Sequence, residues 1–244
     1  MQMKKLLLFA SLTVAAHVSF AQSRALQGNT AELNLANQGA NNANSTIMTF
    51  DSRYEGVKGS PYFMDSWTKS TITMADNAVY QDVEILYNVY ANELLYRETV
   101  GAEKLLPSHR IQSFTMKDAA SGKVYTLRHL NQAQGADPKF AYNFYIMLHD
   151  GKKAQLATMP QKIMKKANYQ GAYNADKPYD ELVNEFTYYV VNNNKMEKVK
   201  LNKKNLLKAL SDKQAEVQAF LGKEKIDATT EDGWVKALAH YETL

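Results

Sequence analysis

The chain has 244 residues, and 29 Lys and Arg against 25 Asp and Glu leave a formal net charge of +4 at neutral pH. This balance does not indicate a nucleic-acid-binding protein, whose basic surface normally gives a much larger positive excess. The absence of cysteine excludes disulfides, thiolate zinc sites, iron–sulfur clusters and cysteine nucleophiles. Apolar residues make up 45% of the chain and aromatic residues 11%, which is enough to bury a core as one domain.

Residues 1–21 have the pattern of a secretory signal peptide. Lys4 and Lys5 precede an apolar run over residues 6–20, and the small residues Ser19 and Ala21 occupy the two positions that a signal peptidase reads. The run is shorter than the roughly 20 apolar residues of a membrane-spanning helix. We therefore expect cleavage before Gln22, a periplasmic or secreted protein, and no transmembrane segment in the mature chain.

Residues 22–45 are rich in Asn, Gln, Ala and Gly and contain few bulky apolar side chains. Such a segment buries too little apolar area to offset the entropy of ordering it, so we expect a flexible leader. A partner-binding arm is the alternative interpretation of this leader.

Residues 46–201 carry the pattern of an antiparallel β domain. Apolar and polar residues alternate at residues 82–88 and 142–148, and this period of two is typical of strands. Further strands are predicted at residues 70–74, 94–99, 110–117, 123–130, 153–159, 185–191 and 195–201. Asn, Asp and Gly stand between these runs, and short turns join antiparallel neighbours. So many strands predict a curved antiparallel meander sheet or a partly open barrel.

The meander is expected to be interrupted at residues 160–180, a long excursion with one helical turn that serves as a binding loop or covers a sheet edge. Residues 202–244 predict short helices packed on the β domain, so the fold class is α+β. Asn202 and either Thr229 or Thr230 are expected to cap helices. Ser211 is expected to begin a helix through a capping box, and Gly222 to end it.

The densest basic stretch contains six lysines between residues 195 and 208. Lysines on an edge strand prevent pairing with other chains, and a solvated edge hairpin is the favoured interpretation. Contact with an anionic lipid or polysaccharide is the alternative.

No familiar hydrolase, nucleotide-binding or dinucleotide-binding motif occurs in the sequence. Four histidines remain after processing, none within metal-ligand spacing of another: His109, His129, His149 and His240. We therefore predict no catalytic residue, no metal site and no cofactor. One alternative is a hydrolase that combines His129 and His149 with an acidic residue. Another is a purely structural partner protein that uses the leader.

Aromatic residues exceed what one face of a sheet can bury, because tyrosines on both faces of one strand cannot enter the same core. Either the C-terminal helices cover the second face, or this face forms an aromatic groove that binds a small molecule, a lipid or an envelope protein, with no nucleic-acid partner. The candidate ligand-binding residues are Tyr62, Trp67, Tyr87, Tyr142 and Phe144. The predicted function is an exported, non-catalytic envelope protein that acts as a ligand-binding or scaffold module.

Three features resemble a set of uncharacterised exported proteins of Gram-negative bacteria. They are the Tyr-Phe-Met-Asp-Ser-Trp run at residues 62–67, the Tyr-Asn pair at 87–88, and the helical tail that ends in Ala-His-Tyr at 239–241. The similarity extends from Tyr54 to the end of the chain. That group has no assigned activity, so the resemblance implies export and adds no site residue.

Overall fold

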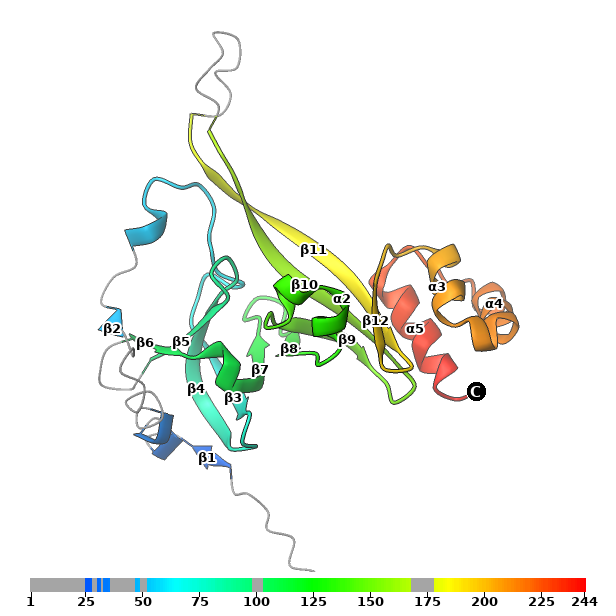
Figure 1. Cartoon of the computed structure of the whole chain (residues 1–244), viewed down its shortest axis with the longest axis horizontal. Coiled ribbons are helices and arrows are strands. Elements are labelled where there is room, and N and C mark those ends of the chain that lie inside the picture. The colour runs from blue at the N-terminus through cyan, green and yellow to red at the C-terminus, as the bar shows by residue number, and fades with distance from the viewer. Residues whose placement is uncertain are drawn as a thin grey trace, which may run out of the picture.

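The computed structural model describes residues 25–27, 30–31, 33–35, 47–48, 52–97, 103–167 and 178–244. These residues form one open sheet of twelve strands, with short helices at the C-terminal end (Figure 1). The predicted α+β class with a curved antiparallel sheet is confirmed, and the sheet does not close into a barrel. The predicted signal peptide and most of the predicted leader lie outside the described residues. No helix in the described ranges is long and apolar enough to cross a membrane.

Two antiparallel meanders make up the sheet. The first consists of β3 (Thr68–Met74), β4 (Val79–Asn88), β5 (Glu93–Arg97) and β6 (Glu103–Leu106). The second begins with β7 (Ile111–Lys117), which pairs with β3, and continues through β8 (Val124–Arg128), β9 (Tyr145–Asp150), β10 (Ala154–Lys165), β11 (Glu181–Asn192) and β12 (Lys195–Val199). Two short strands complete the sheet: β2 (Ile47–Met48) pairs with β6, and β1 (Leu26–Gln27) runs parallel to β4.

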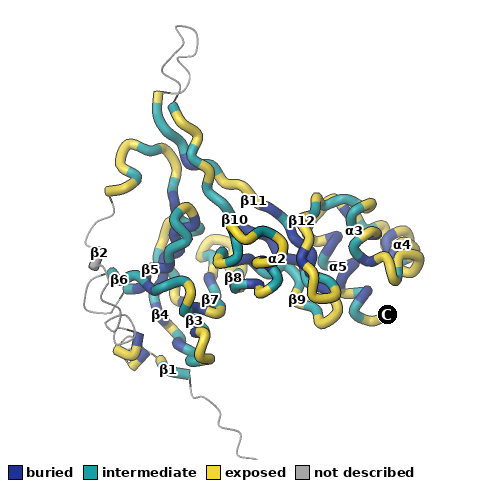
Figure 2. Tube along the Cα trace, viewed as in Figure 1, coloured by how far each residue is buried: buried dark blue, intermediate teal, exposed yellow. Residues whose placement is uncertain are grey.

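The predicted excursion at residues 160–180 is wrong at its start, because residues 160–165 belong to β10. β10 and β11 pair along all twelve of their residues, and they form a twisted ribbon that extends past the rest of the sheet (Figures 1 and 2). Pro160 suggested a break, but β9 pairs with β10 only as far as Thr158. Beyond that point β10 has a neighbour on one side alone, where a residue without an N–H is tolerated. Residues 168–177 lie outside the description.

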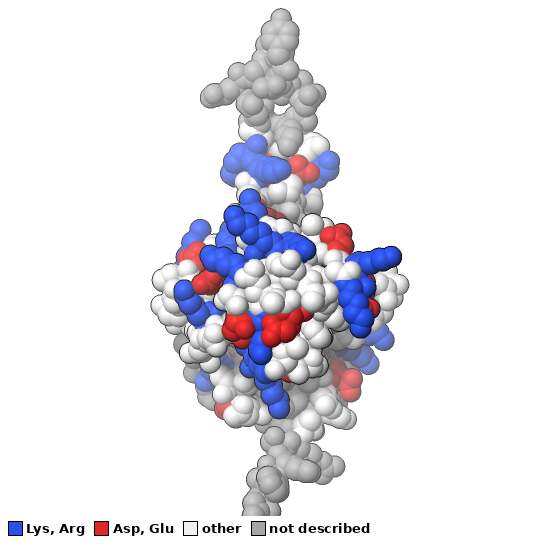
Figure 3. Space-filling view, turned by 90° about the vertical axis from the view of Figure 1, so that its right-hand side faces the viewer, with Lys and Arg blue, Asp and Glu red and all other residues white. Residues whose placement is uncertain are grey.

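The lysine-rich stretch lies on the edge strand β12 and on α3 (Lys203–Ala209). All six lysines are exposed, and Figure 3 shows basic side chains over this end of the molecule. Only Lys195 has an ion pair within the described chain, with Glu197 at 2.9 Å. Exposed lysines on an edge strand are the arrangement that prevents pairing with another chain.

The first meander must curl because β6 and β7 are consecutive in the chain but lie four positions apart in the sheet. In a flat sheet that separation would be roughly 19 Å. The connection contains only Pro107 and the 3-10 turn η2 (Ser108–Arg110), and five extended steps would reach at most about 17 Å. A bulge at Asp82, with φ of 59°, adds to the bend of β4. The result is a half-barrel.

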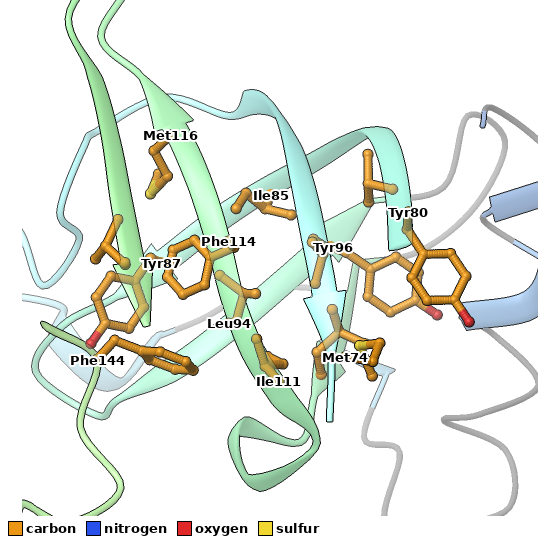
Figure 4. Close-up of a cluster of buried hydrophobic side chains, with 14 of the residues drawn as sticks. Met74, Tyr80, Ile85, Tyr87, Leu94, Tyr96, Ile111, Phe114, Met116 and Phe144 are labelled. Atoms are coloured by element: carbon orange, nitrogen blue, oxygen red, sulfur yellow. The ribbon is translucent and has the colours of Figure 1, made fainter. Parts of the chain in front are cut away.

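The half-barrel encloses the first core, which we call the half-barrel core (Figure 4). Tyr87, Phe114 and Phe144 meet edge to face there, with ring centroids between 4.9 and 5.7 Å apart. Such aromatic contacts stabilise a core beyond their burial alone.

Part of the predicted leader packs on this half-barrel. Leu26 and Gln27 pair with β4, and the side chains of Ala31 and Leu35 are fully buried in the half-barrel core. This differs from the expectation of flexibility at these positions. A few apolar residues at helical spacing are enough to anchor this part of the segment, although the segment as a whole is polar in composition.

The C-terminal helices form a second core, which we call the helix core. α3, α4 (Gln214–Lys223) and α5 (Glu231–Tyr241) pack against β9, β10 and β11 through Trp234, Leu238 and their neighbours. The Trp234 indole Nε1 donates to the carbonyl of Ala228 at 2.8 Å. A third cluster lies on the opposite face under the short helix α2 (Ala133–Ala136).

Two of the predicted helix caps are confirmed. The Asn202 side chain accepts from the N–H of Asn205 at 2.8 Å, and the Thr230 hydroxyl accepts from that of Gly233 at 3.0 Å. Most of the predicted Asn and Gly turn positions also take a left-handed conformation, since Asn77, Asn92, Asn193, Asn194 and Gly122 have positive φ, whereas Gly151 does not.

The boundaries predicted for the middle helix are wrong. Ser211 begins a 3-10 turn, η4 (Ser211–Lys213), and α4 starts after it without a side-chain cap. Gly222 lies inside α4, and Lys225, with φ of 52°, takes the left-handed position that ends the helix. The N–H of Ile226 then donates to the carbonyl of Leu221 at 3.0 Å, which is the closure of a Schellman-type end.

Glu242 joins the end of α5 to the β9–β10 turn. Its carboxylate accepts hydrogen bonds of 3.0–3.1 Å from the backbone N–H groups of Lys152, Lys153 and Ala154. A Cβ on Gly151 would clash with this carboxylate, so only glycine fits there. Burial favours a higher pKa for Glu242, but the three N–H donors outweigh it and the net pKa is lowered.

We predict that Glu242→Gln lowers the free energy of unfolding by roughly 2 kcal/mol, because an amide cannot replace a charge that accepts three N–H groups. Since the folded-state pKa is lowered, the stabilisation is complete above the ordinary pKa of 4.5 and is lost as pH falls through the lower folded-state value. Urea unfolding of both chains at several pH values measures this. Glu216→Gln, on an exposed helix surface, is the control. If the difference in unfolding free energy between Glu242→Gln and the original chain did not shrink in acid, the stabilising role of the Glu242 carboxylate would be contradicted.

Candidate functional site

Both cores lie on the same face of the sheet. On β8, Tyr125 and Leu127 share a face, and Leu127 belongs to the half-barrel core. On β10, Leu156 and Thr158 share a face, and Leu156 belongs to the helix core. Leu148 of β9 packs against both cores. The curled first meander covers one part of this face and the C-terminal helices cover another. Between these two covers lies a hollow instead of a further packed element.

We call this hollow the aromatic cleft. It consists of two adjoining cavities of about 490 and about 160 Å³, which share Phe63, Tyr125 and Phe186. Ile146, Leu148 and Thr158 line the smaller cavity. The larger cavity lies against Met64 and the β7–β8 turn.

The position of Phe63 is fixed by main-chain pairing. The Phe63 N–H donates to the carbonyl of Tyr87 at 2.9 Å, and the Val89 N–H donates to the carbonyl of Pro61 at 2.9 Å. Between them, the fully buried Asn88 donates to the Tyr54 hydroxyl at 3.1 Å and accepts from the N–H of Ala91. Residues 61–67, which we call the entry segment, are thus attached to the end of β4.

The other two rings come from β8 and from the ribbon. Phe63 and Tyr125 meet edge to face at 5.2 Å. Phe186 lies on β11 opposite Pro160, and 47% of its surface is exposed. Phe186 is the least covered of the three, because no strand or helix among the described residues lies over that part of the ribbon face.

Charged groups surround the apolar rings. The Lys123 ammonium lies 4.7 Å from the centre of the Tyr125 ring. At the helical edge, Glu231 accepts from the Tyr188 hydroxyl at 2.8 Å. Burial, followed by the hydrogen bond to Glu231, raises the pKa of Tyr188 to about 12. Asp65 and Asp118 border the larger cavity. The cleft therefore combines an apolar interior with a polar rim.

A larger hollow of about 750 Å³ lies on the opposite face of the sheet; we call it the polar pocket. Arg128 and Gln155 line it, and each alternates along its strand with residues that face the aromatic cleft or its cores. The remaining wall comes from the start of β7 and from the β8–β9 connection around α2.

Arg128 of the polar pocket is paired with Asp150, which lies beside the pocket. The two terminal nitrogens of Arg128 donate to the two oxygens of Asp150 at 3.0 and 2.7 Å. Gln155 donates to the same carboxylate at 3.0 Å. At the rim, Tyr142 is 67% exposed.

Of the five residues predicted for an aromatic groove, only Tyr87 and Phe144 are in ring contact with each other. Tyr87 and Phe144 are buried in the half-barrel core, where burial raises the pKa of Tyr87 and its hydroxyl donates to Asn92 at 3.0 Å. Tyr142 lies in the polar pocket.

Tyr62 and Trp67 are placed in the entry segment. Tyr62 forms a β-bridge with Asn88, and Trp67 is covered by the Arg97 guanidinium, 4.9 Å above its ring. None of the five lines the aromatic cleft.

Sequence reasoning missed Tyr125 and Phe186 as site residues. Phe186 alternates with Tyr188 and Val190 along β11, so its face was readable from the period of two. Phe186 lay inside the strand predicted at residues 185–191, but the predicted excursion hid its surroundings, because it treated Pro160, the partner of Phe186 on β10, as part of a loop. Phe63 belonged to the aromatic run at 62–67 but had no feature that distinguished it from its neighbours.

His129 and His149 have separate surroundings. The two ring nitrogens of His129 lie 3.0 Å from the carbonyls of Asn143 and Ser108, and the ring stacks on Phe144. His149 lies 3.9 Å from Glu242, which is already occupied by backbone donors. The two histidines share no partner, and the described ranges hold no cluster of His, Asp and Glu suited to a metal ion.

Comparison with protein-family models, with curated proteins and with solved structures found no match for this chain.

We predict that Phe186→Ala changes the free energy of unfolding by less than about 1 kcal/mol, because the ring is half exposed. Phe144→Ala should cost roughly 3–5 kcal/mol, because it leaves a cavity in the half-barrel core. Chemical unfolding of the two variants compares a cleft ring with a core ring. Equal losses would mean that the cleft aromatics serve packing alone.

Proposed function

We propose that the protein is an exported, non-catalytic binding module of the cell envelope that holds an apolar or amphipathic small molecule or lipid in the aromatic cleft. The observation that carries this proposal is the convergence of three rings on the strip of sheet between the two cores, where 47% of the Phe186 surface is exposed. A protein occupied with folding alone would cover such a strip, because exposed aromatic area is unfavourable in water.

The size and chemistry of the cleft support a ligand of this class. The larger cavity, of about 490 Å³, falls within the range of roughly 300–1,000 Å³ that is usual for small-molecule sites. Each Å² of apolar surface buried contributes about 25 cal/mol, so three rings supply affinity without any charge pairing. Lys123, Glu231 and Asp65 at the rim provide partners for one polar end of the ligand.

Binding is favoured over hydrolysis by the placement of the polar side chains. Catalysis by His and a carboxylate requires both within hydrogen-bond reach of one substrate atom. His129 is held between two carbonyl oxygens and His149 lies beside a carboxylate that already accepts three backbone donors. Neither histidine borders the aromatic cleft.

Export rests on residues 1–21, whose charge, apolar run and small residues follow the signal-peptide pattern. We predict that N-terminal sequencing of the chain recovered from the periplasm or medium of the exporting cell begins at Gln22. Recovery of the intact N-terminus from those fractions, or recovery only from the cytoplasm, would contradict export.

The binding proposal is tested with the neutral, fluorescent, apolar probe N-phenyl-1-naphthylamine. The exported chain should enhance its fluorescence in a saturable manner. The double variant Tyr125→Ala/Phe186→Ala should weaken binding by about tenfold or more, because it removes two of the three rings.

The control is Tyr90→Ala, which removes an exposed tyrosine outside the cleft. Native mass spectrometry of the same chains from the envelope fraction should show an added mass that disappears on denaturation and in the double variant. A double variant that binds the probe as tightly as the original chain would sink the cleft as the site.

A further inference from the structure

We propose that the polar pocket is a second binding site and that it takes a neutral oligosaccharide. It lies on the opposite face of the sheet from the aromatic cleft, with different residues and different chemistry. The inference therefore stands or falls independently of the proposed function.

The first observation is the presentation of Tyr142. Its ring is 67% exposed at the rim of the pocket, whereas its backbone is held in place. The Asn92 side chain donates to the Tyr142 carbonyl at 2.8 Å and itself accepts from the buried Tyr87 hydroxyl. An exposed ring on a hydrogen-bonded backbone offers an apolar platform with a polar tip, and the C–H face of a pyranose ring can pack on such a platform.

The second observation is the charge balance of the floor. Arg128 and Asp150 neutralise each other through two hydrogen bonds. The Nε of Arg128 is buried and has no hydrogen-bond partner among the described residues. A neutralised charge pair favours an uncharged ligand, such as one that carries hydroxyl groups, over an anion that would also approach Asp150.

The third observation is the amide content of the wall. Gln112, Asn131 and Gln134 border the pocket, are exposed, and make no side-chain hydrogen bond within the described part of the chain. A primary amide both donates and accepts, as a hydroxyl does. Several amides around one hollow therefore match a ligand that carries many hydroxyl groups.

The wall between these groups is rigid. The carbonyls of Asn143 and Ser108 fix the His129 ring, which stacks on Phe144 at 4.0 Å between centroids. Gln132 is tied to Asn194 in the β11–β12 turn at 2.8 Å. A pocket whose frame is already ordered loses little entropy when a ligand binds.

The test is calorimetric titration of the full exported chain with three neutral tetrasaccharides: cellotetraose, maltotetraose and chitotetraose. At least one should bind, with the affinity reduced about tenfold or more in Tyr142→Ala and in Gln134→Ala. Tyr142→Phe should retain most of the affinity, because the stacking face remains.

Two control variants show whether binding depends on this pocket. Tyr90→Ala removes an exposed tyrosine outside the pocket, and Tyr125→Ala/Phe186→Ala alters only the aromatic cleft; both should bind the tetrasaccharide normally. Failure of all three sugars to bind at millimolar concentration would overturn the proposal. So would unchanged binding by Tyr142→Ala, or binding only of the acidic comparator tetragalacturonate.

Discussion

The structure depends on one constraint: a single face of the sheet is covered by two different elements that do not meet. The short β6–β7 connection forces the first meander to curl over its own apolar side chains. The C-terminal helices cover the far end of β9, β10 and β11. Each cover is complete in itself, with Phe144 sealed in one core and Trp234 in the other. The strip between them stays open because neither the curl nor the helices extend far enough to cover it, and the aromatic cleft is that strip.

Polar contacts hold the two covers in place at their edges. On one side, Asn88 and the main chain of residues 61–63 attach the entry segment to β4 and so deliver Phe63. On the other side, Glu242 fixes the end of α5 to the β9–β10 turn, and Glu231 at its start accepts from Tyr188. Because buried or partly buried carboxylates and amides are costly when unpaired, these contacts specify where each cover stops. Hydrogen bonds therefore fix the two borders of the cleft, and apolar residues line its interior.

The fold was largely predictable from sequence, but the site was not. Period-two runs and Asn or Gly turns identified nearly every long strand, because both signals are local. β6 was missed because it is short and only one of its residues is buried. The outer part of the ribbon was missed because Pro160 reads as a breaker unless the absence of a strand on one side is known. The cleft joins Phe63, Tyr125 and Phe186 from three distant segments, and no local pattern reveals which aromatic residues a core will leave uncovered. Tyr87 and Phe144 were chosen for the same aromatic character, yet the curl placed them inside.

The two proposed sites arise from the alternation of side chains between the two faces of the same strands. β8 contributes Tyr125 to one hollow and Arg128 to the other, and β10 contributes Thr158 and Gln155 in the same way. Since side chains alternate between faces, a shift of one residue in register would exchange the apolar and polar linings. The irregularity between Leu156 and Ala157 is where that register is set, because the extra residue on β9, Leu148, packs against both cores. Because of that bulge, β9 packs against both the half-barrel core and the helix core. The aromatic side chains of the cleft lie on one side of the sheet and the amide side chains of the polar pocket on the other.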